Sequence, residues 1–117
     1  MDTSTTTSDV ICSDKVEGTS VYNIKGDKLG SIDSLMIDKY SGQVRHAVLE
    51  FGGFLGLGTD LYPIPWSLLK YDQTQDGYVV PLDKELLSAA PRYPHGNESP
   101  FITDLEYGRQ VNHFYGS

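Results

Sequence analysis

A chain of 117 residues supports one small domain with a thin core, so association with another chain would add stability. Its formal net charge is −7, and its nine Lys and Arg residues are scattered. This pattern argues against nucleic acid or an anionic membrane as partner, because both attract clustered Lys and Arg. No apolar run approaches the ~18–20 residues of a membrane span, and residues 1–10 lack the features of a signal peptide. We therefore expect no direct membrane insertion.

Cysteine usage bears on the compartment. Cys12 is the only cysteine, so no disulfide can form within the chain, and a cysteine-based metal site would need other ligands. A lone thiol fits a reducing compartment. We expect a cytoplasmic protein.

The N-terminal third is predicted to lead into an antiparallel meander. Residues 1–8 are polar and are expected to be disordered. Residues 9–12 form a short apolar run typical of an edge strand. Residues 13–18 suit a turn or one helical turn, with Ser13 as N-cap and Gly18 at a left-handed exit.

Three strands are predicted next, over residues 20–24, 28–39 and 43–51. The alternation of the second strand breaks near Asp33, which predicts a β-bulge. The third strand carries Val44 and Val48 on the face opposite its main apolar set. A half-solvated strand would be polar there, so we expect a second subunit or the C-terminal tail to cover this face.

The segment 52–58 is a glycine-rich apolar loop. It consists of Gly52, Gly53, Phe54, Leu55, Gly56, Leu57 and Gly58. Loops are normally polar, so these apolar residues either cap the open end of a barrel or form a partner or self-association surface. The following residues are Thr59 and Asp60, not the Lys-Ser/Thr of a phosphate-binding loop, and we reject nucleotide binding.

The chain after this loop is predicted to close the sheet. Residues 59–64 form a strand in which Pro63 indicates an edge or a bulge. Trp66 lies at a corner, and residues 70–72 and 77–82 form a hairpin. A short helix is predicted over 83–90, with Asp83 as N-cap and with Leu86 and Leu87 facing inward.

The C-terminal part is predicted to be a linker, 92–100, followed by a helix over 103–115. Thr103 and Glu106 have capping-box spacing. The helix has a partial apolar stripe and is too short to be stable alone in water. We expect it to dock on its own domain or on a partner.

Four stretches carry a family resemblance: VYNIKGDKLGSIDSLMIDKYSG (21–42), HAVLEFGGFLGLG (46–58), YPIPWSLLKYD (62–72) and GYVVPLDKELLSAAP (77–91). Together they resemble the PRC-barrel domain family, in particular its short free-standing bacterial members. The likeness runs from Val16 to Pro91. It is more distant to the cytoplasmic domain of the photosynthetic reaction-centre H subunit and to the C-terminal domain of the ribosome maturation factor RimM.

The resemblance implies a mainly β fold, a small and strongly bent antiparallel β-barrel of about six strands. It also implies a docking module without enzymatic chemistry, dimeric in its free-standing forms. We divide the chain into a disordered N-terminus (1–8), a PRC-barrel-like domain (9–91), and a linker with a helical tail (92–117). The expected turn and loop glycines are Gly26, Gly30, Gly42, Gly52, Gly53, Gly56 and Gly58.

Catalytic and metal sites are not predicted. The histidines at 46, 95 and 113 lie far apart and show no metal-ligand spacing. Asp33 and Asp38 fall on opposite faces of an unbulged strand, so turn or bulge stabilisation fits them better than acid–base catalysis. We expect no enzyme, no cofactor and no metal.

The sequence favours a non-enzymatic adaptor, homodimeric and docking an unidentified protein partner. The expected interface residues are Phe54, Leu55, Leu57, Tyr62, Trp66, Val44 and Val48. The alternative function is small-ligand binding, in a barrel mouth or a dimer groove. Its expected lining residues are Tyr40, Phe54, Tyr62 and Trp66.

Overall fold

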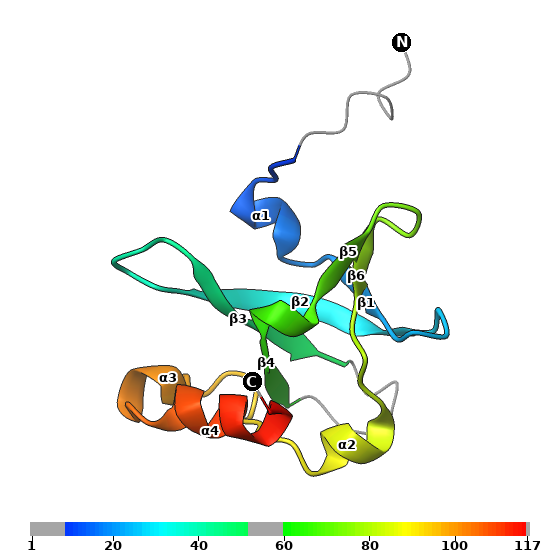
Figure 1. Ribbon diagram of the computed structural model, residues 1–117. Helices are drawn as coiled ribbons and strands as arrows, with labels where there is room; N and C mark the ends of the chain where they lie inside the picture. Colours follow the sequence, from blue (N-terminus) through cyan, green and yellow to red (C-terminus); the bar gives the residue numbers. More distant parts are fainter. Residues whose placement is uncertain (1–8, 52–59, 117) are drawn as a thin grey trace.

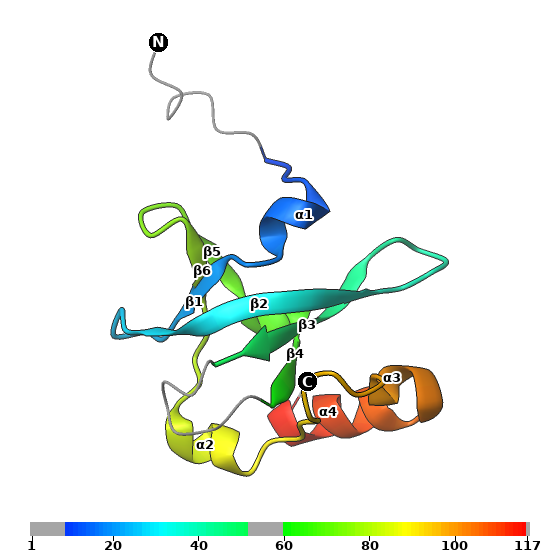
Figure 2. The same ribbon diagram turned by 180° about the vertical axis from the view of Figure 1, so that it is seen from behind.

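The computed structural model describes residues 9–51 and 60–116 (Figure 1). Its strands are β1 (Ser20–Tyr22), β2 (Lys28–Ile37), β3 (Val44–Glu50), β4 (Leu61–Pro65), β5 (Lys70–Asp72) and β6 (Gly77–Val79). Its helices are α1 (Ser13–Val16), the 3-10 helix η2 (Trp66–Leu68), α2 (Lys84–Ser88), α3 (Pro100–Thr103) and α4 (Tyr107–Tyr115). Figures 1 and 2 show α2, α3 and α4 gathered on one side of the sheet and α1 on the other.

The six strands form one mixed sheet in the order β4-β3-β2-β1-β6-β5. Neighbouring strands are antiparallel except for β1 and β6, which pair in parallel. The expectation of a purely antiparallel sheet was therefore wrong. The corner at η2 separates the meander from the β5–β6 hairpin, and this hairpin returns to β1 with β6 running in the same direction. Strands β4 and β5 end the order, so the described sheet is open and not a closed barrel.

The predicted bulge in β2 is confirmed. The register between β2 and β3 shifts between Ile32 and Ser34, on either side of Asp33. A residue inserted into one strand reverses the alternation of its side chains and bends it. Strand β4 also behaves as its proline predicted, because β3 is its neighbour among the described strands and it lies at the end of the sheet order.

Glycine positions are partly as expected. Gly26 and Gly42 have φ values of 92° and 77° in their turns, where glycine is favoured. Gly30, expected in a turn, lies inside β2. A Cβ there would stand 2.1 Å from the carbonyl oxygen of Glu50, so Gly30 permits the close approach of the neighbouring backbone. The glycines at 52, 53, 56 and 58 lie outside the described residues.

The main core fills the space between the bent sheet and α2. Its largest fully buried members include Tyr62, Phe51, Ile32, Leu49, Ile64 and Leu87. Asp83 caps α2 as predicted, because its carboxylate accepts a hydrogen bond from the Leu86 N–H at 2.8 Å. Leu87 faces inward, but Leu86 is partly exposed, so the predicted inward position of Leu86 was wrong.

Two terminal predictions were also wrong. Residues 10–12 form no strand, and the N-cap of α1 is Cys12, not Ser13. The tail is not one helix from 103 to 115. Ser99 caps a short helix that begins at Pro100 and ends at Thr103, and α4 begins at Tyr107, so Thr103 forms no capping box.

Replacing Gly30 by Ala should destabilise the sheet, by about 3 kcal/mol or more, because backbone atoms cannot move aside cheaply. Gly108→Ala is the matched control, since the nearest atoms to a Cβ there are 3.6 and 3.7 Å away and the site is helical. We expect it to be neutral or stabilising. Urea unfolding measures both variants, and equal midpoints for the two would contradict the close contact at Gly30.

Candidate functional site

The tail covers the outer face of β3 and β4. Tyr107 and Val111 of α4 pack with Val48, Leu61 and Tyr93 in a second apolar cluster, separate from the main core. Tyr93 is held in place by paired backbone hydrogen bonds with Leu61, at 2.7 and 3.0 Å. The predicted cover over the Val48 face is therefore present, and in a single chain it is the C-terminal tail. We call this contact the tail junction.

His46 is the polar centre of the tail junction. Its side chain is 4% exposed, and its Nε2 lies 2.8 Å from Oδ1 of Asn112 on α4. Its ring packs against Phe101 of α3, with centroids 5.0 Å apart. Burial lowers the pKa of His46, and the nearby Arg45 lowers it further, while the hydrogen bond to Asn112 raises it. The neutral ring thus donates from Nε2 to the tail.

The tail junction contains buried polar atoms without hydrogen-bond partners. Among the described residues these atoms are Nδ1 of His46 and the hydroxyls of Tyr107 and Tyr115. Burial raises the pKa of Tyr107 to about 12 and also raises that of Tyr115, so both phenols stay neutral. A buried polar group left unpaired costs about 1–3 kcal/mol. The apolar contacts of the tail are therefore opposed by these polar atoms, one on β3 and two on α4.

A groove of about 580 Å³ runs beside this junction. Trp66, Pro65 and Val44 line it from the sheet side, and Leu105 and Arg109 from the tail side. Its arginines take part in ion pairs at the surface, Arg45 with the largely covered Asp38 and Arg109 with the exposed Glu106. Such surface pairs contribute little stability.

Asp38 stabilises the β2–β3 turn. Its carboxylate accepts hydrogen bonds from the N–H groups of Ser41 and Tyr40, at 2.9 and 2.8 Å. These bonds, together with Arg45, lower the pKa of Asp38 to about 2. Asp33 stands at the bulge of β2. The interpretation of both carboxylates as structural fits this geometry.

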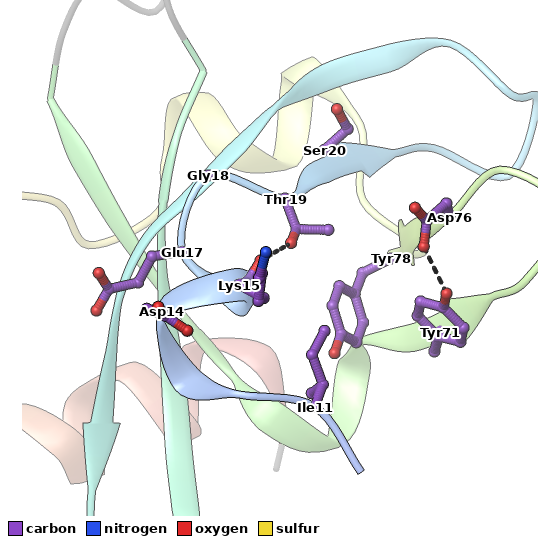
Figure 3. Close-up of a pocket in the computed structure, with 10 residues that line it drawn as sticks. All are labelled: Ile11, Asp14, Lys15, Glu17, Gly18, Thr19, Ser20, Tyr71, Asp76 and Tyr78. Atoms are coloured by element: carbon purple, nitrogen blue, oxygen red, sulfur yellow. Dashed lines mark hydrogen bonds between the residues drawn. The ribbon is translucent and has the colours of Figure 1, made fainter. Parts of the chain in front are cut away.

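A second cavity, of about 660 Å³, opens between α1 and the β5–β6 hairpin (Figure 3). The ring of Tyr78 stands between Ile11 and Tyr71, and the Tyr71 hydroxyl donates to Asp76 Oδ1 at 2.6 Å. That hydrogen bond raises the pKa of Tyr71. Tyr78 also packs on Trp66, with ring centroids 5.4 Å apart. Tyr71 and Tyr78 are the aromatic residues in the lining of this cavity.

The expected interface residues are only partly brought together. Phe54, Leu55 and Leu57 lie outside the described residues. Val48 and Tyr62 are fully buried, Val48 in the tail junction and Tyr62 in the main core. Val44 and Trp66 are half-buried and both line the groove.

The expected ligand-lining set is not gathered at one described cavity. Tyr40 stands in the turn after β2 and is 99% exposed, whereas Tyr62 is buried and lines none of the described cavities. Of this set, Trp66 lines the groove. The small-ligand alternative stays a prediction.

Sequence reasoning missed the partners of His46. Asn112 and Phe101 come from the tail, more than fifty residues away, and no local spacing connects them to β3. The signal that was available is the two-sided apolarity of β3, which called for a cover.

The other histidines lie apart from His46. Nε2 of His95 is 3.7 Å from Asp33 Oδ1, and His113 is exposed on α4. In residues 9–51 and 60–116, no group of three or more His, Cys, Asp or Glu side chains is arranged to hold a metal ion. Within the same described ranges, no helix has the length and apolarity to cross a bilayer.

The fold and this site define a small, mainly β domain with an open six-stranded sheet and a helical tail packed on the outer face of β3 and β4. The family model of the PRC-barrel domain matches residues 9–87, so the chain belongs to the PRC-barrel domain family. The match ends before the tail. No curated protein matches the chain.

The buried His46 predicts a pH dependence of stability. In the unfolded chain its pKa returns to about 6.5, above the lowered folded value, so the unfolded chain binds the proton first as pH falls. The contribution of neutral, buried His46 to the free energy of unfolding is complete above about pH 6.5. It is lost as pH falls toward the folded pKa, by at most about 1.4 kcal/mol per pH unit. Urea unfolding between about pH 7.5 and 5.5 measures this loss.

His46→Gln should flatten this pH dependence, because an amide can still bond Asn112 but does not titrate. His95→Gln, at an exposed histidine, is the matched control and should keep it. Equal pH slopes for wild type and His46→Gln would show that His46 is not the titrating group.

Proposed function

We propose that this protein is a non-enzymatic interaction module, homodimeric, that docks a protein partner through the apolar residues of segment 52–58. The observation that carries the proposal is its membership of the PRC-barrel domain family over residues 9–87, which suggests a protein-interaction module. The composition of segment 52–58 supports the finer statement. Its non-glycine residues, Phe54, Leu55 and Leu57, are all large and apolar.

The segment joins two strands that are held firmly. It follows Phe51 and leads into β4, and Phe51 packs edge-on against Tyr62 with ring centroids 5.1 Å apart. Both aromatic residues belong to the main core. The residues to which the segment is joined are therefore held by core packing.

The apolar side chains of segment 52–58 would supply part of the free energy of binding. Burial of one large apolar side chain contributes about 1.5–3 kcal/mol. Three such side chains offset part of the cost of association, which is several kcal/mol. Further contacts are needed for tight binding, and a second copy of the chain would double the number of docking segments.

Leu57→Asp tests the docking segment. The variant should lose capture of protein partners from a lysate of the source cell, compared with wild type by quantitative mass spectrometry, because a carboxylate cannot be buried unpaired. Ile24→Asp, which adds the same charge at an exposed turn residue, is the matched control and should keep capture. Sedimentation of all three proteins gives the oligomeric state.

Two results would count against the proposal. One is identical capture by wild type and a folded Leu57→Asp. The other is a wild-type protein that stays monomeric at high micromolar concentration, which would remove the homodimer while leaving the docking segment to be judged by capture.

A further inference from the structure

The tail follows the part of the chain that the family model matches and packs back onto it. Tyr107 and Val111 of α4 belong to the tail junction, and Phe114 and Tyr115 at the end of α4 also pack against the main core. In the tail junction, α4 packs against Val48 of β3, Leu61 of β4, and Tyr93, which is hydrogen-bonded to Leu61. The sheet face under α4 is therefore a ready-made surface for one amphipathic helix, and the helix known to fit it is α4 itself.

We propose that α3 and α4 exchange between two copies of the chain, so that α4 of each copy lies on β3 and β4 of the other. The occupant of the helix-binding face is then a second copy of this chain. The inference rests on the proposed homodimer and deepens it, because it names the segment and the surface that form the dimer.

The connection to the tail permits the exchange. Residues 94–98 are all exposed, and Gly96 has a φ of 90°. The hydrogen bond from Asn97 N–H to the Pro94 carbonyl, 3.3 Å long, stays within the segment. From Tyr93 to Pro100 there are seven Cα steps, which span at most about 25 Å when extended. An extended hinge of this length can carry the tail to an adjacent copy.

The tail junction also permits opening. Opening would let water reach Nδ1 of His46 and the hydroxyls of Tyr107 and Tyr115, which lack partners in the docked state. Their hydration offsets part of the cost of opening, because a buried polar group without a partner is unfavourable. Protonation of His46 favours the open state, since the charged ring is poorly accommodated under the tail and Arg45 stands beside it.

Other groups around His46 do not reverse this effect. Arg109 on α4 lines the same groove, and its partner Glu106 is exposed. Asp38, on the β2 side, is already paired with Arg45. Asn112, Phe101 and Gly108 of the tail are neutral, as are Pro65 and Trp66 across the groove. Exchange should therefore be faster at mildly acidic pH.

Exposed apolar side chains favour a second copy over the closed single chain. Ile102, within α3, and Leu105, between α3 and α4, are 64% and 93% exposed. A flexible tether gives the closed form an effective concentration of roughly millimolar, so exchange without new contacts would need similar protein concentrations. Burying one such side chain between the two copies strengthens association about tenfold or more. Domain exchange is a low-cost route to a symmetric dimer.

The decisive experiment uses full-length wild type. Equal amounts of isotope-labelled and unlabelled protein are incubated together at mildly acidic pH and near-millimolar concentration, and the dimer is isolated. Isotope-filtered NMR then detects contacts between copies. We expect a contact between the rings of His46 and Phe101, which lie 5.0 Å apart. A dimer that shows this contact only within one copy, or no dimer at all, would overturn the exchange.

Hinge length gives a second test. Deleting residues 96–98 should raise the dimer fraction, because a short hinge disfavours the closed form. Replacing Asn97 and Glu98 by Ser, with Gly96 kept because its φ is 90°, preserves the length and should leave the fraction unchanged. A deletion variant that remains a monomer with protected α4 amides would refute the proposal. Loss of partner capture in Leu57→Asp would still support the docking segment, so the two proposals fail separately.

Discussion

Strand β3 is buried on both faces, and the rest of the structure depends on this constraint. Ala47 and Leu49 face the main core, while His46 and Val48 face the tail. A sheet strand with two apolar faces needs two covers. The bent sheet and α2 supply one, and the tail supplies the other. Residues beyond the family match therefore complete a face of the domain.

The parts of the fold that the sequence predicted are those with a local cause. The bulge at Asp33 followed from a break in alternation, the cap at Asp83 from its position before an apolar helix, and the edge position of β4 from Pro63. The family resemblance is confirmed by the match to residues 9–87, and the mainly β class that it implied is confirmed by the six-stranded sheet. These features depend on neighbours within a few residues or on a long, specific pattern.

The parts that escaped prediction depend on long-range contacts. The parallel pairing of β1 and β6 joins strands more than fifty residues apart, and no local pattern marks it. Gly30 is required because the Glu50 backbone of another strand approaches it closely. In the sequence, such a glycine cannot be distinguished from a turn glycine. The contact between His46 and Asn112 has the same character. The sequence could show that a cover was needed, but not which side chains would meet there.

The tail also shows why a predicted single helix became two. Pro100 fixes a helical start with Ser99 as its cap, and Asp104 then accepts a hydrogen bond from the Glu106 N–H at 2.9 Å, which favours a turn over a continued helix. The break lets Phe101 reach His46 from α3 while Asn112 reaches it from α4. A straight helix begun at Thr103 would leave out Phe101. The two-part tail thus contacts one buried histidine from both of its helices, so the packing of α3 and the hydrogen bond of α4 meet at a single ring.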